Sequence, residues 1–319
     1  METQLLESAA EAGRLLAIGR LVAFPTETVF GLGANILNER AVEKIFEAKG
    51  RPADNPLIVH IAKFDMWNQV AADVTRSAVA LIEAFSPGPI TVVLKKKPEI
   101  SSLVTAGLDS VGIRVPSCTV AQQVLQAAGV PIAAPSANLS GRPSCTTWRS
   151  VLEDMRGKVD AILCKDSSEI GLESTVVDCR TEEPILLRTG AISLKELRRV
   201  VPEARAVRTS EKEASLGSPG LRHPHYQPRA KVEVIDNRHS HAGDPRNVAY
   251  IGMTEPQGLE SFVLVRIANS VEEYSKVFYE FLRVADRSGA ELILCEAVAP
   301  VGIGDALNDR MRRSAGLDG

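Results

Sequence analysis

The stretch Ala48-Lys49-Gly50-Arg51-Pro52 marks the point where a predicted helix gives way to a predicted strand. Upstream of it, apolar side chains from Val42 to Phe46 recur at three- and four-residue steps, which indicates an amphipathic helix. Gly50 is the expected end of this helix, because glycine enters the left-handed conformation at little cost. Pro52 prevents the helix from resuming, and the apolar run 57–61 then predicts a buried strand.

Lys49 and Arg51 therefore lie two residues apart, on a stiff loop between a helix and a strand. Lysine provides a point charge and arginine a bidentate fork, and both groups suit a phosphate. The stretch thus predicts an anion clamp. The alternative is a pair of solvated surface cations, one of them at the negative end of the helix dipole.

Working outward, predicted strands are separated sometimes by helices and sometimes only by short loops. This alternation favours an α/β fold with a mixed sheet and flanking helices over a strictly parallel sheet. A helix is expected over 4–19, and a hydroxyl-rich turn with two glycines over 25–33. Further strands are expected over 21–24, 90–94, 111–115, 132–134, 161–164, 175–178 and 185–187, and helices over 76–84, 120–128, 147–155 and 194–200.

The composition of the chain changes after about residue 205, which suggests three parts: a domain over 1–206, a linker over 207–230 and a smaller Rossmann-like α/β domain over 231–319. The linker is polar and punctuated by Pro and Gly. It nevertheless carries Arg222, His223, His225 and Tyr226, which are unusual side chains for a linker that only connects two domains. We therefore expect residues 216–228 to close as a lid over a site in the first domain. The second domain is expected to have strands over 232–235, 248–251, 262–267 and 292–295, and helices over 271–285 and 304–314.

Composition excludes several classes of function. The 319 residues carry a net charge of −3, so nothing global indicates binding to nucleic acid or to an anionic membrane. The five cysteines lack zinc spacing, and their odd number favours free thiols in a reducing, cytoplasmic setting. We expect no membrane span and no signal peptide. The glycine-rich loops of P-loop and Rossmann nucleotide sites are absent, as are the nucleophile-elbow and zinc-protease motifs, so a bound nucleotide would need another kind of loop.

Polar side chains lie inside or just beyond several predicted strands. Ser136 and Asn138 follow the strand that ends at Ala134, and their spacing of two points both side chains the same way in an extended chain. Ligands of open α/β sheets bind beyond the carboxyl ends of strands, although an ordinary turn would also fit this stretch. Arg114 lies within an apolar strand, where it needs either an internal carboxylate or a bound anion. His60 lies in mid-strand, where a core histidine is the alternative to a functional one.

Each of these signals is weak alone, but together they describe one kind of site. The group supplies cations and hydroxyls with few spare carboxylates, which is the chemistry of a site for a large anion. Its members are Thr26, Lys49, Arg51, Arg114, Ser136, Asn138, Ser174 and Arg188.

The combined motifs resemble the YrdC/Sua5 family of L-threonylcarbamoyladenylate synthases. They are Pro-Thr-Glu-Thr-Val-Phe-Gly-Leu-Gly (25–33), Lys49-Gly50-Arg51-Pro52, Asn55-Pro56-Leu57, Gly112-Ile113-Arg114-Val115-Pro116, Pro135-Ser136-Ala137-Asn138 and Ser174-Thr175-Val176-Val177-Asp178. Further motifs, Ser218-Pro219-Gly220, His225-Tyr226-x-Pro228 and Gly302-x-Gly304-x-Ala306-x-x-Asp309-Arg310, resemble the two-domain Sua5 branch. The resemblance covers nearly the full chain. It implies a YrdC-like twisted mixed sheet over 1–206 and a Sua5-type C-terminal domain.

The family resemblance also implies a reaction. L-threonine, bicarbonate and ATP give threonylcarbamoyl-AMP and pyrophosphate, with Mg²⁺ carried on the ATP phosphates, as the first step of tRNA N6-threonylcarbamoyladenosine formation. The product is expected to pass to the tRNA threonylcarbamoyl-transferase machinery. By resemblance, four residues form a central tetrad around the phosphates and the carbamate: Lys49, Arg51, Ser136 and Asn138. The tetrad also binds ATP, together with Asn55, Ser110, Ser144, Arg188 and Tyr226. The residues expected to bind threonine are Thr26, His60, Arg114 and Ser174. The chain departs from the family's common Arg-Pro-Gly at Arg188-Thr189-Gly190, which is expected only to loosen a turn.

Two other functions remain as alternatives. A carbamoyl-transferring relative serves in hydrogenase maturation, but it lies within a longer chain whose acylphosphatase-like and zinc-finger parts are not visible here. An RNA-binding module is the alternative from another class, and the net charge of −3 argues against it. The sequence assigns no role to the C-terminal domain.

Overall fold

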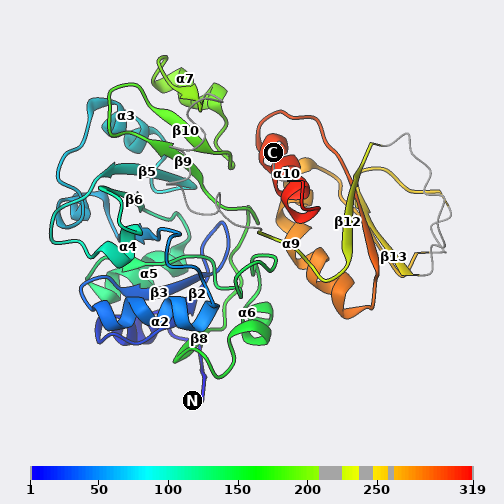
Figure 1. Cartoon of the computed structure of the whole chain (residues 1–319), viewed down its shortest axis with the longest axis horizontal. Helices are drawn as coiled ribbons and strands as arrows, with labels where there is room; N and C mark the ends of the chain where they lie inside the picture. The colour runs from blue at the N-terminus through cyan, green and yellow to red at the C-terminus, as the bar shows by residue number, and fades with distance from the viewer. Residues whose placement is uncertain (1, 208–224, 237–246, 258–261, 318–319) are drawn as a thin grey trace.

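The computed structural model describes residues 2–207, 225–236, 247–257 and 262–317. These residues form two lobes, a large lobe up to residue 207 and a small lobe from residue 231 onward (Figure 1). Within the described residues, the large lobe carries an 11-stranded sheet in the order β1-β8-β2-β3-β7-β4-β6-β5-β9-β10-β11. The small lobe has a 4-stranded sheet in the order β12-β15-β13-β14. The predicted α/β class, with a second and smaller domain, is confirmed.

The large sheet is mixed, since parallel and antiparallel neighbours occur side by side. Its strands are β1 (Gln4–Leu6), β2 (Val22–Phe24), β3 (Gly31–Asn35), β4 (Ile58–His60), β5 (Ile90–Lys95), β6 (Ser110–Arg114), β7 (Ile132–Ala133), β8 (Ala161–Leu163), β9 (Thr175–Asp178), β10 (Ile185–Arg188) and β11 (Arg205–Ala206). Its helices are α1 (Ala9–Ala17), α2 (Glu39–Lys49), α3 (Arg76–Phe85), α4 (Ser102–Thr105), α5 (Thr119–Ala128), α6 (Trp148–Met155) and α7 (Leu194–Val200), with a 3₁₀ helix η1 (Phe64–Gln69).

Helices cover both faces of the large sheet. Along β2, Val22 and Phe24 pack into one core cluster with α1 and α5, whereas Ala23 packs into the cluster on the opposite face with α2, α3 and α6. This alternation is the period of two that a strand buried on both faces requires. The polar ends of the strands, rather than their faces, are therefore where a site can open.

Two local predictions were wrong. Residues 4–6 are a strand and not the start of the first helix, because they pair in parallel with β8, with Gln4 opposite Ala161. Gly31 and Gly33 lie in β3 and not in a turn. A Cβ at Gly33 would lie 2.9 Å from side-chain atoms of both Leu16 and Phe24, so glycine serves close packing of a strand here.

The helix–loop–strand prediction around Gly50 is confirmed. Helix α2 ends at this residue, which adopts the left-handed conformation with φ 59°. Strand β4 follows after a short loop. The loop that carries Arg51 is thereby fixed at both ends.

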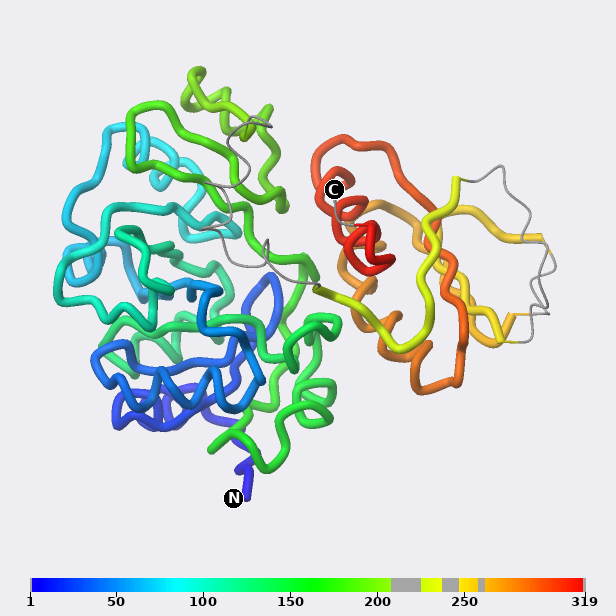
Figure 2. Tube along the Cα trace, in the orientation of Figure 1, coloured from blue at the N-terminus to red at the C-terminus, as the bar shows by residue number. Residues whose placement is uncertain are grey.

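The small lobe presents its helices to the large lobe. It consists of β12 (Lys231–Ile235), β13 (Val248–Gly252), β14 (Leu264–Ile267), α9 (Val271–Arg287), β15 (Leu292–Glu296) and α10 (Ile303–Ser314). In Figures 1 and 2, α9 and α10 lie between the small sheet and the large lobe. The core cluster of the small lobe includes Val29 and Leu172 of the large lobe, so the two lobes share apolar contacts. No helix among the described residues is long and apolar enough to cross a membrane.

Candidate functional site

A pocket of about 650 Å³, counting the space at its mouth, opens at the strand ends of the large sheet that face the small lobe. Strands β4 and β6 run parallel with His60 opposite Arg114, so their carboxyl ends bring both side chains to one edge. The residues predicted from the sequence that line the pocket are Thr26, Arg51, His60, Arg114, Ser136, Asn138, Ser174, Arg188 and Tyr226. Residues far apart in the chain thus meet at this pocket.

Arg114 is paired with an internal carboxylate, which decides between the two alternatives left open above. Its guanidinium lies 2.6 Å from Glu27 Oε1 and donates to Thr28 Oγ1 at 2.8 Å. Burial by itself would raise the pKa of Glu27, but the charge and hydrogen bond of Arg114 lower it below its usual range. Arg114 is therefore held rigidly while it lines the pocket.

Lys49 is not a surface residue. Its side chain is only 2% exposed, and Nζ donates to the backbone carbonyls of Ser136, at 2.5 Å, and of Asn138. Burial first, and then the charge of Arg51, lowers the pKa of Lys49 to about 7. Lys49 thus lies behind the Ser136–Asn138 loop and supports it, whereas Arg51 lines the pocket itself. The alternative of two solvated cations is wrong.

Arg51 is fixed by the backbone of its own loop. Its guanidinium donates to the carbonyl oxygens of Asn55 at 3.2 Å and Pro56 at 2.9 Å. Burial lowers its pKa to about 10. Asn55 therefore holds Arg51 through its carbonyl, and the Asn55 side chain is not part of the pocket lining.

Ser110 and Ser144, both predicted on the ATP side, also lie outside the pocket lining. Ser110 begins β6, opposite Lys95, whereas Arg114 at the pocket ends the same strand. A strand of this length separates the two by about 13 Å. Ser144 lies behind the wall and donates to Glu173 Oε1 at 2.6 Å.

The wall formed by Ser174 and Arg188 is also hydrogen-bonded internally. Arg188 donates to the carbonyl of Ser174 through Nε at 3.1 Å and through Nη2 at 2.9 Å. The Ser174 hydroxyl lies 2.8 Å from Thr91 Oγ1 and accepts from Arg188 Nη2 at 3.2 Å. The predicted hydroxyls and cations are thus held in place before any ligand arrives.

Glu173 is a pocket residue that reasoning from the sequence missed. It accepts hydrogen bonds from three side chains: Ser144 of the large lobe, and Tyr279 and Arg310 of the small lobe, the latter two at 3.0 Å. Glu173 directly precedes a motif that the sequence marks, Ser174 to Asp178. The adjacent pair Glu173-Ser174 is the only signal that could have indicated it, because its partners lie in another domain.

The described end of the linker reaches the pocket. His225 and Tyr226 line it, and the Tyr226 ring lies 5.2 Å from the ring of Tyr279. The backbone of Gln227 donates to Gly141 of the large lobe at 2.8 Å. Tyr226 has a φ of 67°, which is unusual for a bulky residue and needs support from its surroundings. Most of the predicted lid, including Arg222 and His223, lies outside the described residues, so the lid stays a prediction.

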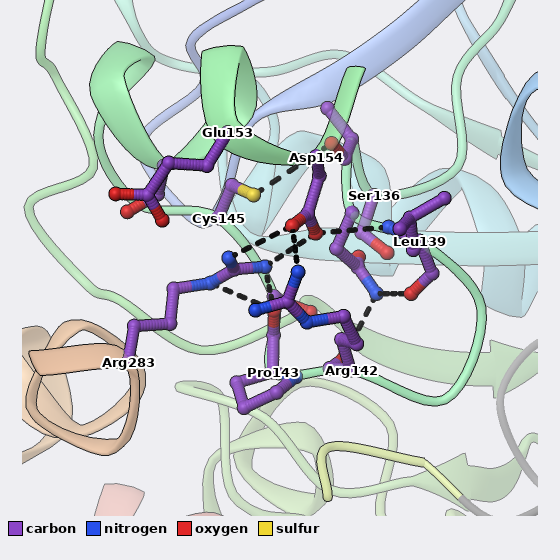
Figure 3. A network of polar contacts seen from close by, with 12 residues as sticks. Ser136, Leu139, Arg142, Pro143, Cys145, Glu153, Asp154 and Arg283 are labelled. Carbon is purple, nitrogen blue, oxygen red and sulfur yellow. Dashed lines mark hydrogen bonds and ion pairs between the residues drawn. The ribbon is translucent and has the colours of Figure 1, made fainter. Parts of the chain in front are cut away.

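A polar network holds the loop that follows Asn138 (Figure 3). Asp154 of α6 accepts from the backbone of Leu139 at 3.0 Å, from Arg142, and from Arg283 of the small lobe at 2.8 Å. Arg283 also donates to the carbonyl of Pro143 at 2.6 Å. Burial would raise the pKa of Asp154, but the hydrogen bonds and charge of Arg283 hold it below its usual range. The small lobe therefore supports a loop of the active pocket.

We expect Arg283→Met to lower the free energy of unfolding by about 3 kcal/mol, because it removes one partner from a buried charge pair. Arg283 is 1% exposed. The matched control is Arg287→Met, which removes another ion pair between the lobes. Its partner across the lobes is Glu153, and these two side chains are 42% and 41% exposed; Arg287 also pairs with Glu280 of its own helix. The control should cost less than about 1 kcal/mol. Urea unfolding of both variants measures the difference, and equal midpoints would contradict a supporting role for Arg283.

His60 should make the protein sensitive to acid. Burial first, then the charge of Arg114, lowers its pKa from 6.5 to about 3. Below pH 6.5 His60 is therefore protonated in the unfolded state but stays neutral in the folded state. The free energy of unfolding consequently decreases as the pH falls toward 3. Between pH 7 and pH 5 this amounts to about 2 kcal/mol. In urea unfolding of the unliganded protein, His60→Gln should lose that much less than the wild type over this interval; equal losses would contradict the assignment.

The pocket offers cations for phosphates rather than carboxylates for a metal. Among the described residues, no group of three or more His, Cys, Asp or Glu side chains could hold a metal ion. Glu173 lines the pocket, but its oxygens already accept from Arg310, Tyr279 and Ser144. The donor set therefore fits Mg²⁺ only as an ion that phosphate oxygens bind first.

Two family models together match nearly the whole chain. Residues 14–190 match the Sua5/YciO/YrdC model described as "Telomere recombination", and residues 192–316 match the model described as "Threonylcarbamoyl-AMP synthase, C-terminal domain". The chain belongs to the Sua5 family of threonylcarbamoyl-AMP synthases. The motif-based resemblance to the two-domain Sua5 branch is thereby confirmed.

Individual Sua5 relatives align along almost their full length. The threonylcarbamoyl-AMP synthase of Pyrococcus abyssi is 40% identical over 313 residues, which cover 93% of this chain and 91% of that protein. The Bacillus subtilis threonylcarbamoyl-AMP synthase is 37% identical over 320 residues, covering 96% and 92%. A crystal structure of P. abyssi Sua5 complexed with L-threonine matches with a TM-score of 0.90 at 36% identity, and covers 100% of this chain and 98% of that one.

Proposed function

We propose that this Sua5-family enzyme makes threonylcarbamoyl-AMP from L-threonine, bicarbonate and ATP, and releases pyrophosphate and water. The observation that carries this proposal is the pocket wall itself. Arg114 and Arg188 end strands β6 and β10, Arg51 lies on the loop between α2 and β4, and the three side chains meet at one pocket. Every substrate of this reaction is anionic or carries a carboxylate, so fixed cations are what the pocket must supply.

The chemistry divides into two steps. The threonine nitrogen attacks the carbon of bicarbonate, and water leaves as the carbamate forms. A carbamate oxygen then attacks the α-phosphorus of ATP, and the bond to the β-phosphate breaks to release pyrophosphate. The protein's contribution is to hold three reactants in line and to offset their mutual repulsion, as in other phosphoryl transfers.

We assign the two sides of the pocket to the two larger substrates. Thr26, His60, Arg114 and Ser174 would hold threonine, and Arg51, Ser136, Asn138, Arg188 and Tyr226 would hold ATP. Within the part of the chain that the structure describes, Asn138 Oδ1 and His225 Nε2 are buried without a hydrogen-bond partner. Buried polar atoms normally have partners, so both atoms are suited to bind a ligand. Lys49 and Ser144 would act from behind the wall, and Asn55 through Arg51. Ser110 has no evident role.

Mg²⁺ would enter this site on the phosphates of ATP, where it neutralises charge on the leaving pyrophosphate. We further propose that the enzyme works in the cytoplasm. Its product, an easily hydrolysed mixed anhydride, would pass to the tRNA threonylcarbamoyl-transferase machinery for the next step of N6-threonylcarbamoyladenosine formation. A lid over residues 216–228 would suit such a product, because closure excludes water.

Pyrophosphate release tests this function. We expect release from ATP only when L-threonine and bicarbonate are both present, with threonylcarbamoyl-AMP detected by mass spectrometry. A carbamoyl transferase would instead use carbamoyl phosphate, and an RNA-binding module would release no pyrophosphate at all. Either of these results would contradict the proposal.

A further inference from the structure

Arg310 of the small lobe reaches into the wall of the active pocket. It is 0% exposed, and its guanidinium contacts two separate segments of the large lobe. Nε donates to Glu173 Oε2 at 3.0 Å, and Nη2 donates to the carbonyl of Thr189 at 2.8 Å. Glu173 precedes β9, and Thr189 directly follows Arg188 at the end of β10. One side chain of α10 therefore joins the two segments that carry Glu173 and Arg188.

The local packing leaves little freedom at this junction. A Cβ at Gly190 would lie 2.3 Å from the backbone nitrogen of Thr175, so the turn after Arg188 is pressed against the start of β9. The guanidinium carbon of Arg310 also lies 5.8 Å from the ring centroid of Tyr226. Arg310 thus contacts both walls and the described end of the linker.

Glu173 is the group whose charge needs this partner. It is a carboxylate on the wall of a pocket that must receive anions. Burial alone would raise its pKa, but the charges of Arg310 and then Arg188 lower it, together with the hydrogen bond from Ser144. The other titratable groups that face Glu173 are His225, Tyr226 and Tyr279. Arg310 is therefore the strongest electrostatic partner that keeps Glu173 ionised at this wall.

The loss of Arg310 would change the electrostatics of the pocket in a definite direction. The pKa of Glu173 would rise, and at a pH above that value the carboxylate would carry an uncompensated charge, because a buried carboxylate needs a partner. In its charged form it would repel the phosphates and would compete with them for Arg188. Both effects weaken the binding of an anion more than the binding of a neutral or zwitterionic ligand.

We propose that Arg310 is a positioning residue of the active site: through Glu173 and the turn at Thr189 it keeps the wall next to Arg188 attractive to the nucleotide. This inference rests on the proposed function, since it takes ATP as the ligand. It gives the C-terminal domain a specific role in the reaction. The domain supports, through Glu173, the wall of a pocket whose charged lining residues all come from the large lobe and the linker, as far as the described residues show.

The first test compares Arg310→Met with Arg287→Met. The control also removes an arginine of the small lobe that pairs across the lobes, but its partners Glu153 and Glu280 are not part of the pocket lining. We expect Arg310→Met to raise the KM for ATP at least about tenfold, to raise the Kd of a non-hydrolysable ATP analogue in calorimetry equally, and to change the KM for threonine less than about threefold. The control should match the wild type. Equal ATP affinity in all three proteins would overturn the proposal.

The second test removes the charge of Glu173. If Arg310 acts by compensating this carboxylate, the double variant Arg310→Met/Glu173→Gln should bind ATP within about threefold of the wild type. A role restricted to domain docking predicts no such recovery, because the double variant lacks still more contacts. Failure of Glu173→Gln to restore ATP affinity would therefore overturn the proposal, even if Arg310→Met alone were impaired.

A pH series adds a readout that a structural role would not change. In Arg310→Met the pKa of Glu173 should rise, so the ratio of variant to wild-type KM for ATP should increase as the pH rises through that value; a flat ratio would overturn the proposal. Should thermal unfolding show that Arg310→Met does not fold, Arg310→Gln replaces it in both tests, because glutamine removes the charge and keeps hydrogen-bond donors. Wild-type pyrophosphate release reports on the proposed function separately. If the wild type released no pyrophosphate, the proposed function would be wrong. The affinities of the variants for the ATP analogue, relative to the wild type, test the role of Arg310.

Discussion

Lys49→Ala is expected to lower kcat about 100-fold, because it removes a charge that acts on the phosphates from behind the pocket wall and releases the Ser136–Asn138 loop. The burial of Lys49 adds a second effect that the sequence does not predict. A surface lysine would carry little stability, but this side chain is 2% exposed and donates to two backbone carbonyls. Its removal leaves a cavity and two unpaired acceptors, which should cost about 2 kcal/mol. Steady-state kinetics and urea unfolding measure the two effects.

Lys49→Met separates charge from volume. Methionine fills the space without the charge, so this variant should recover part of the stability and none of the rate. A signature of the charge itself is proton uptake. With a pKa of about 7, Lys49 is mostly neutral at pH 8, and the approach of ATP should restore its charged form. Calorimetry in buffers of different ionisation enthalpy should show this uptake in the wild type and not in Lys49→Met. Wild-type kcat in either variant would contradict the tetrad.

With 2-aminobutyrate in place of threonine, kcat/KM is expected to fall at least about 100-fold, and with serine about tenfold. A site built to pair a hydroxyl rejects an analogue without one more strongly than an analogue that lacks a methyl. The structure gives this expectation a physical basis. Thr26 and Ser174 are each 1% exposed and their hydroxyls are already hydrogen-bonded to neighbouring groups, so these hydroxyls cannot rearrange cheaply to compensate for a missing partner.

The comparison requires that the nucleotide side stays unchanged. The KM for ATP should therefore be the same with all three amino acids, and pyrophosphate release should be measured with bicarbonate at saturation. Similar kcat/KM values for threonine and 2-aminobutyrate would show that the pocket does not recognise the threonine hydroxyl through a hydrogen bond. Loss of ATP affinity with the analogues would instead place the amino acid against the nucleotide.

Much of the fold could be predicted from local sequence because its signals are local. The apolar period of α2, the glycine that ends it and the apolar run of β4 lie within about two dozen residues and need no distant partner. The same holds for α9 and α10 in the small lobe. The strand at 4–6 could not be predicted in this way, because its partner is β8, more than 150 residues away. Gly33 was predicted to lie in a turn because the reason for a glycine there, close packing against side chains of other elements, is not visible in the local sequence.

The features of the site also fall into those that local sequence determines and those that depend on distant partners. The sequence by itself determined which residue types gather at the strand ends, and through its motifs it determined the family. Only the tertiary structure decided that Arg114 pairs with Glu27, that Lys49 lies behind the wall, and that Glu173 is a pocket residue held by Arg310, 137 positions away. The physical reason is that burial and the pairing of charges depend on distance in space. A charged side chain has the same identity at the surface and in the core, and only its neighbours determine whether it binds a ligand, supports a loop or compensates another charge.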